Sequence, residues 1–192
     1  MKLKNVLMTL VVLSGPVVAA GSPGSPTTAD REWLKQQENL SEQLRQHPDK
    51  QLQQELEALA EISPEKRDTT LLIAPHCLHD FLDFNDFLAL ADDLVEAMDL
   101  GGILQVAAFH PQFQFDGTDV DDVSNCTNRT PYPTLHLLRE DSIDKAVEAL
   151  PEAEEIFERN IEVLEKLGKP GWDALDVGAH ACPHMQQQQT KA

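Results

Sequence analysis

Apolar residues recur along this chain at two different spacings, and these spacings predict both strands and helices. Residues 69–74 and 103–109 are largely apolar at consecutive positions, a pattern typical of strands that are covered on both faces. Residues 133–138 form a third apolar run of strand length. Between the first two runs, apolar side chains repeat every three to four positions, which predicts an amphipathic helix. These helical positions are Phe81, Phe84, Leu88, Ala91, Val95 and Met98.

Capping residues predict where this central helix begins and ends. Asp80 precedes the helix and can accept hydrogen bonds from the first N–H groups, which no helical carbonyl reaches. Asp83 lies in the first turn, where a negative charge interacts favourably with the helix dipole. The pair Gly101-Gly102 follows the last apolar position and can end the helix.

Further helices are predicted at both ends of the chain. Residues 29–46 and 49–62 are rich in Gln, Glu and Lys, and their apolar positions form only a thin stripe. Residues 142–150 have the length of a short helix. Pro151 can open another helix, where proline is tolerated at the first position, and Gly168 can close it.

A strand–helix–strand unit of this kind crosses over right-handed, so the first two predicted strands run in the same direction. Their carboxyl ends then lie at one edge of the sheet, and a hairpin return brings the start of the third strand to that edge. His76, His79, His110 and Tyr132 are therefore expected to converge where open α/β sheets bind ligands. The predicted fold class is α+β, a small mixed sheet of three or four strands with flanking helices in a ferredoxin-like β-α-β-β-α order.

The amino end is predicted to be a secretory signal peptide. Lys2 and Lys4 form a basic start, residues 6–13 an apolar core, and residues 18–20 (VAA) a small-residue cleavage site. The protein is therefore expected to be periplasmic or secreted, with no membrane contact once the signal is removed. The predicted regions are a signal peptide (1–20), a linker (21–28), a polar helical region (29–67), an α/β core domain (68–177) and a flexible tail (178–192).

Composition narrows the classes of partner. The chain has 192 residues, enough for one domain with a sizeable core, and a net charge of −18. Nucleic acid is excluded because phosphate binding needs a concentrated basic face, which the sequence lacks. The cysteines Cys77, Cys126 and Cys182 allow at most one intramolecular disulfide. Cys77–Cys126 is the better pair if their loops meet, and three unpaired thiols fit the sequence equally well.

The polar segment between the second and third predicted strands carries the candidate chemistry. His110 directly follows a strand, so it could be the catalytic acid–base group. Arg129 offers a rigid fork for the carboxylate or phosphate of a small anionic ligand. Asn125, Asn128 and Tyr132 could orient that ligand. The alternative is structural, with His110 bonded to the following loop and the Asn- and Pro-rich motif forming an ordered turn.

No metal site is predicted, and the sequence identifies no cofactor. The aspartates between residues 116 and 122 lack EF-hand spacing and are expected to form a solvated acidic loop. His180, Cys182 and His184 are soft-metal ligands close together, but no second cluster completes a structural zinc set. His136 lies on a predicted strand and is expected to be packed rather than catalytic.

Five segments of the predicted core carry long and specific motifs. They are TTLLI (69–73), DFLDFNDFL (80–88), LQVAAFHPQFQF (104–115), NCTNRTPYPTLHLLRE (125–140) and IFERNIEVLEKLG (156–168). Through these motifs, residues 68–177 resemble the bacterial family known as domain of unknown function 1415. The resemblance implies no particular activity, because none is established for that family.

The resemblance breaks in two places. Members of the family are usually cytoplasmic, and a Trp-Leu helix in them leads into a Cys-Pro segment and an extra strand. Here Trp33-Leu34 resembles the start of that helix, but no Cys-Pro follows, and a signal-like segment precedes it. Members also carry a histidine before proline after the first strand, where this chain has Ala74. A function that needs that cysteine or histidine is therefore not expected here.

Two classes of function follow. The first is a small-molecule binding protein or enzyme that uses a strand-end pocket, with His110 as the acid–base group and Arg129 as the anion clamp. The second is a non-enzymatic periplasmic interaction domain, in which the loop is a rigid element presented to a protein partner. The two differ in whether His110, Arg129 and Tyr132 point into one concavity or away from one another. The sequence supplies neither the substrate nor the reaction.

Overall fold

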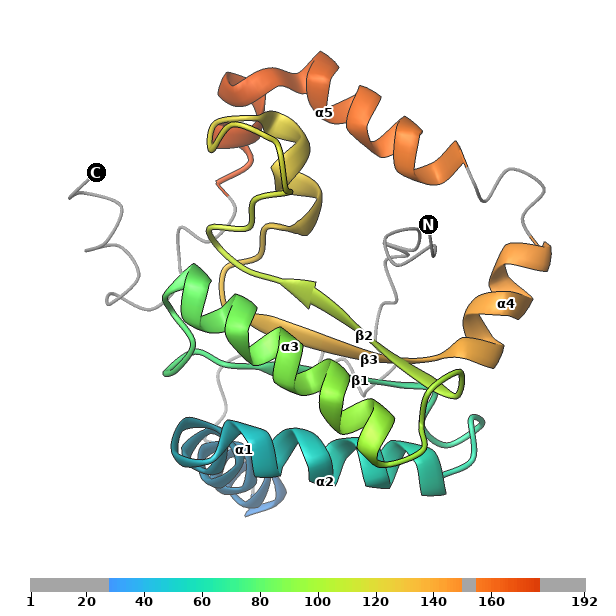
Figure 1. The fold of residues 1–192 in the computed structure, drawn as a ribbon. Coiled ribbons are helices and arrows are strands. Elements are labelled where there is room, and N and C mark those ends of the chain that lie inside the picture. The colour runs from blue at the N-terminus through green and yellow to red at the C-terminus, as the bar shows by residue number, and fades with distance from the viewer. Residues whose placement is uncertain (1–27, 150–154, 177–192) are drawn as a thin grey trace.

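A computed structural model describes residues 28–149 and 155–176 of this chain (Figure 1). The predicted signal peptide, nearly all of the linker, and the tail lie outside the described residues. The elements in chain order are α1 (Thr28–Gln46), α2 (Pro48–Glu61), β1 (Thr69–Ile73), α3 (Phe81–Ala97), β2 (Leu104–Phe109), the 3-10 helix η1 (Val123–Asn128), β3 (Thr134–Arg139), α4 (Glu140–Ala149) and α5 (Glu155–Ala174).

The three strands form one sheet in the order β1-β3-β2. The central strand β3 is antiparallel to both of its neighbours. Strands β1 and β2 therefore run in the same direction, as the crossover argument predicts, but β3 separates them. The sheet is consequently antiparallel rather than mixed. The α+β class is confirmed, whereas the ferredoxin-like arrangement is not, since the described residues contain three strands.

Helix α3 begins and ends close to the predicted positions. The Asp80 carboxylate accepts hydrogen bonds from the N–H groups of Leu82 (2.8 Å) and Asp83 (3.2 Å), which the helix itself cannot satisfy. After the helix, Gly102 has a φ of 78°, a left-handed conformation that glycine adopts without strain. The chain thereby turns back sharply and enters β2.

Helices α2 and α3 cover one face of the sheet, and the hydrophobic core lies between them and that face (Figure 1). Each large aliphatic or aromatic side chain buried there contributes about 1.5–3 kcal/mol relative to an exposed one. The core therefore joins the unit β1-α3-β2 to α2, which belongs to the polar amino-terminal region. The fully or nearly fully buried members are Leu52, Leu56, Leu59, Leu72, Phe84, Ala91, Leu104, Leu135 and Leu137.

The opposite face of the sheet is open at β1. Leu71 and Ile73 are 36% and 49% exposed, although residues 69–74 were expected to be covered on both faces. The reason lies in where the later helices pack. Helix α4 contacts β3 and α5 contacts η1, so neither extends across β1. The apolar pattern thus predicts the position of β1 correctly, but the prediction that both faces of the strand are buried is wrong.

A buried arginine fastens α2 to the central strand. The guanidinium of Arg139, on β3, donates hydrogen bonds to the backbone carbonyls of Leu59, Ile62 and Arg67. The first two carbonyls lie at the carboxyl end of α2, where the helix dipole is negative and carbonyls lack helical partners. A positive charge is stable in this buried position because it caps the helix end.

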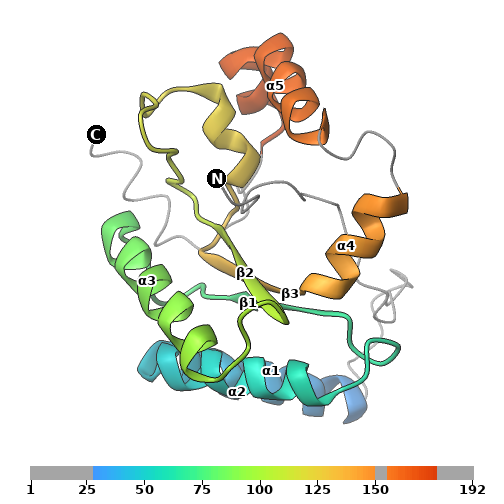
Figure 2. The same ribbon diagram turned by 45° about the vertical axis from the view of Figure 1, so that its right-hand side comes forward.

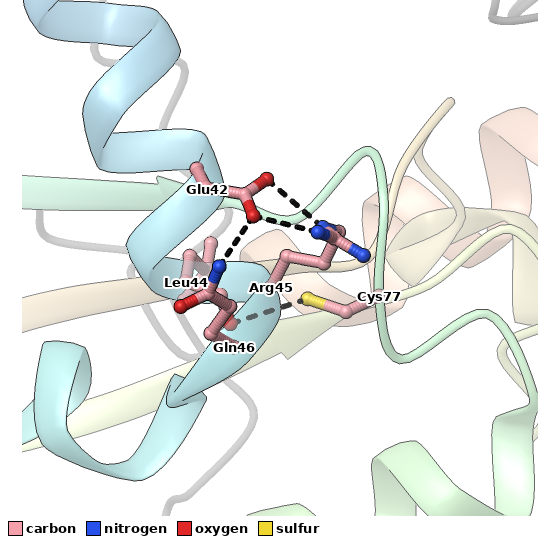
Figure 3. Close-up of polar contacts among 5 residues, drawn as sticks. All are labelled: Glu42, Leu44, Arg45, Gln46 and Cys77. Carbon is pink, nitrogen blue, oxygen red and sulfur yellow. Dashed lines mark hydrogen bonds and ion pairs between the residues drawn. The ribbon is translucent and has the colours of Figure 1, made fainter.

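Helix α1 is held near the loop that precedes α3 (Figure 3). The Cys77 thiol in that loop donates to the carbonyl of Leu44 at 3.6 Å. Within α1, the Glu42 carboxylate accepts from the side chains of Arg45 and Gln46, and the Arg45 bond lowers the pKa of Glu42. These bonds order the last turn of α1 where it meets the rest of the domain.

Helix α5 packs on η1 and is broken near its end. Gly168 has a φ of 65° and leaves the helical path, with Pro170 two residues later. The predicted helix end at Gly168 therefore corresponds to a kink. Among the described residues, no helix is both long and apolar enough to cross a membrane.

Candidate functional site

The strand ends converge as the sequence predicts. Thr134, at the start of β3, pairs with Ile73 at the end of β1 and with Phe109 at the end of β2. The long polar segment leaves the sheet at His110 and returns at Pro133, so both of its ends lie at this edge. We call residues 110–132 the polar loop.

His110 is completely buried and both of its ring nitrogens are hydrogen-bonded. Nδ1 accepts from the N–H of Gln112 at 3.0 Å, so the proton lies on Nε2, which donates to the carbonyl of Leu78 at 3.1 Å. The ring also packs against Phe81 and Phe84, with centroids 5.3 and 5.0 Å away. Burial lowers the pKa of His110 and keeps the imidazole neutral, although the bond to Leu78 acts in the opposite direction.

The bond from His110 also supports an unusual backbone conformation. Leu78 has a φ of 57°, in the left-handed region that a residue with a Cβ rarely adopts. Such a conformation costs about 1–3 kcal/mol and persists where surrounding contacts hold it. His110 therefore joins the loop before α3 to the loop after β2, two segments that are distant in sequence.

The side chains of Asn125 and Asn128 form hydrogen bonds within the polar loop and with the end of β2. Asn125 is fully buried, and its side-chain oxygen accepts from the Phe115 N–H and the Thr118 hydroxyl, both at 2.9 Å. Its amide donates to the Asp119 carbonyl at 2.9 Å. Asn128 donates to the Ala108 carbonyl at 3.0 Å and accepts from the Thr127 hydroxyl at 3.2 Å.

Arg129 also binds the chain's own backbone. Its Nε donates to the Phe113 carbonyl at 3.1 Å and an Nη donates to the Val120 carbonyl at 2.7 Å. Tyr132 is half-buried, and its carbonyl accepts from the hydroxyls of Thr130 and Thr134. The donors and acceptors that the sequence assigned to a ligand thus form bonds within the protein, and their catalytic and ligand-binding roles stay predictions.

A cleft of about 720 Å³ lies on both sides of β2, between α3 and α4. Its apolar lining comes from α3, β2 and α4, and Phe113 of the polar loop also reaches it. Four carboxylate residues line it as well: Asp92 and Glu96 from α3, and Glu140 and Asp144 from α4. No lysine, arginine or histidine of the described residues lines the cleft, so its electrostatic character favours a cationic occupant over an anionic one.

Sequence reasoning missed this cleft because its lining comes from several elements that are separate in the sequence. In the sequence, each of the four carboxylates lies on a polar helix face of the kind that is ordinarily exposed to solvent. The available signal was the pairing of acidic and apolar residues on α3 and α4, for instance Leu88 with Asp92 and Ile143 with Asp144. Only the sheet order brings the two helices to opposite sides of one strand.

Other reactive side chains do not form a second site in the part of the chain that is described. No three His, Cys, Asp or Glu residues there are grouped so that they could hold a metal ion. Cys77 and Cys126 are both free thiols, and burial raises the pKa of each. The Cys77–Cys126 disulfide that the sequence left open is therefore absent. Cys182, His180 and His184 lie outside the described residues.

The structure defines a small α+β domain with an internally bonded polar loop and an acidic cleft. The chain belongs to the family described as "Protein of unknown function (DUF1415)", which it matches over residues 32–174. This match begins in α1, earlier than the segment from residue 68 whose motifs carry the resemblance. The chain is also 44% identical over 52 residues to the periplasmic protein TrbC of Escherichia coli (strain K12). That stretch covers 27% of this chain and only 24% of the relative, and no solved structure matches the chain.

Proposed function

We propose that this protein is a non-enzymatic, periplasmic interaction domain. In this proposal the polar loop is a structural scaffold, and the acidic cleft along β2 is the binding surface. One observation carries the proposal: the polar groups of His110, Asn125 and Arg129 bond to the chain's own backbone. A catalytic acid–base group has to reach the proton that it transfers, and His110 is fully buried and bonded at both nitrogens.

The cleft supports the same proposal through its size and composition. Its volume of about 720 Å³ lies in the range of about 300–1,000 Å³ that is usual for binding sites. Apolar side chains supply contact area, while the four carboxylates supply a charge preference. A protein with a net charge of −18 repels polyanions, and the four carboxylates of the cleft add a local negative charge to this repulsion.

The periplasmic location rests on two further observations. The first twenty residues have the sequence pattern of a secretory signal, and the partial relative in Escherichia coli is described as a periplasmic protein. In the described residues, Cys77 and Cys126 are free, so the fold of this part does not need an oxidising compartment.

A ligand screen by thermal denaturation tests the proposal against its competitor, a small anion held by Arg129. The probes are a short oligolysine and the anions phosphate and citrate, each at about 0.15 M salt, where surface charges are already screened. We expect oligolysine to raise the unfolding midpoint and the anions to leave it unchanged. Replacing Glu96→Gln and Asp144→Asn together should reduce the effect, because both side chains are exposed and line the cleft.

A matched control keeps the change in charge and alters only its position. Asp93→Asn with Glu148→Gln removes two exposed carboxylates from the same two helices, but neither residue lines the cleft. This double variant should respond to oligolysine like the parent. If phosphate or citrate stabilises the parent and Arg129→Ala abolishes that stabilisation, the anion-binding function is correct and this proposal is wrong.

A further inference from the structure

β2 is an edge strand whose outward backbone groups border the acidic cleft. Alternate residues of an antiparallel strand direct both of their backbone groups to the same side. The Ile103 carbonyl accepts from the N–H of Glu140, the residue that follows β3, so the backbone groups of Ile103 and of every second residue after it are directed toward β3. The backbone N–H and C=O groups of Leu104, Val106 and Ala108 are therefore directed away from β3, toward the cleft that Val106 and Ala108 help to line.

Asn128 already occupies one end of this free edge. Its backbone carbonyl accepts from the His110 N–H at 3.1 Å, and its side chain donates to the Ala108 carbonyl at 3.0 Å. These are the bonds that a neighbouring strand would form at this position. At the other end, the Leu104 N–H donates to the Leu100 carbonyl at 3.0 Å. Between these two points, no residue of the described ranges 28–149 and 155–176 bonds to the outward groups of Val106.

The two walls of the cleft match the two sides of an added strand. Successive side chains of an extended peptide point to opposite faces of a sheet. A peptide paired with β2 would direct one set toward α3, where Leu88 lies beside Asp92 and Glu96, and the other toward α4, where Ile143 and Val147 lie beside Asp144. Figure 2 shows β2 running between these two helices. Each wall offers apolar contact and negative charge.

We propose that the cleft binds an extended segment of a partner protein by strand addition to β2, and that this segment carries Lys or Arg residues among apolar ones. This inference rests on the proposed function and specifies the partner of the same surface. Main-chain hydrogen bonds to Val106 would hold the segment, and the carboxylates would select it by charge. A second copy of this chain is disfavoured as the occupant, because pairing two β2 edges would bring two sets of carboxylates together.

The test uses three synthetic peptides of about eight residues, the length of an ordinary strand, with Lys and Val alternating. One peptide is unmodified. The other two are N-methylated at alternate residues, one at the odd and one at the even positions, so that composition and charge stay the same. Binding to the full chain is measured by fluorescence anisotropy. A strand paired on one side uses only every second N–H, so one methylated peptide should lose affinity at least about tenfold while the other binds like the unmodified peptide.

The protein variants locate the binding site. Glu96→Gln with Asp144→Asn should weaken binding about tenfold, as expected for two charge pairs of ordinary strength. The control Asp93→Asn with Glu148→Gln should leave it unchanged.

Equal binding of all three peptides would overturn strand addition while leaving a cationic binding domain in place. Failure of every peptide to bind would overturn the proposed function as well. A concentration-dependent dimer in sedimentation that peptide does not dissociate would assign the edge to a second copy and overturn the partner proposal.

Discussion

Replacing His110 by leucine separates a structural role from a catalytic one, and its cost can be worked out from the contacts. His110→Leu keeps an apolar side chain beside Phe81 and Phe84 but removes both hydrogen bonds. The Leu78 carbonyl loses its hydrogen-bond donor, the Nε2–H of the neutral imidazole, and this costs about 1–3 kcal/mol. The Gln112 N–H lies in an exposed residue where water can replace the acceptor, so its loss costs about 0.5–1 kcal/mol. We expect the free energy of unfolding to fall by about 1.5–4 kcal/mol.

The same variant has a characteristic pH dependence. Burial lowers the pKa of His110 in the folded protein, so the unfolded chain takes up the proton first as the pH falls below about 6.5. The stabilisation from neutral His110 is therefore complete above that pH and decreases as the pH falls toward the folded pKa. The leucine variant lacks this titration. The stability difference between parent and variant should consequently become smaller on acidification, by about 1.4 kcal/mol for each unit of pKa depression.

Urea denaturation followed by circular dichroism, at about pH 8 and about pH 5.5, measures both effects, with the m-value as a check on two-state behaviour. Other titrating groups are common to parent and variant and cancel in the difference. His47→Leu is the matched control, because His47 is exposed and makes no side-chain cap bond to α2, and a change within about 0.5 kcal/mol is expected. A variant as stable as the parent at both pH values, or a deficit that grows on acidification, would refute the structural role of His110.

Three other outcomes follow from the structure. Arg139→Met should lower the free energy of unfolding by about 3–5 kcal/mol, because it removes a buried guanidinium and leaves the buried Leu59 carbonyl and the partly buried Ile62 carbonyl without donors. Arg67→Met, which removes the partly exposed pair with Glu55, should cost less than about 1 kcal/mol, and equal losses in urea denaturation would contradict this. Native-state alkylation followed by mass spectrometry should modify half-buried Cys77 before buried Cys126, and both should be modified in denaturant without reductant; a thiol that needs reductant would show a disulfide instead. Intact-mass analysis of envelope protein should place the amino terminus at Ala20 or Gly21, and full-length chain confined to the cytoplasm would contradict export.

Local chemistry made much of the fold predictable. The Asp80 cap, the apolar repeat of α3 and the shared direction of β1 and β2 all depend on neighbouring residues or on chain handedness, and all are seen. The position of β3 between the other strands was not predictable in this way. It depends on which strand the polar loop returns to, and nothing in the loop sequence specifies that choice.

The candidate site shows the same limit more sharply. The sequence singled out His110 and Arg129 as site candidates because polar side chains with rigid geometry cluster in the polar loop. It could not show that their partners are the carbonyls of Leu78, Phe113 and Val120, because those contacts require the folded chain. The acidic cleft was missed for a related reason, since α3 and α4 come to lie on either side of β2 only after the sheet has formed.

Amide hydrogen exchange of the full chain with and without the unmodified Lys–Val peptide tests the central claim most directly. Exchange is followed at single-residue resolution by NMR, because an amide that gains a strand partner becomes protected from solvent. We expect the peptide to protect the Val106 amide and to leave the amides of the polar loop between His110 and Arg129 unchanged. Protection that appears instead within the polar loop, with Val106 unaffected, would contradict the assignment of the β2 edge as the binding surface.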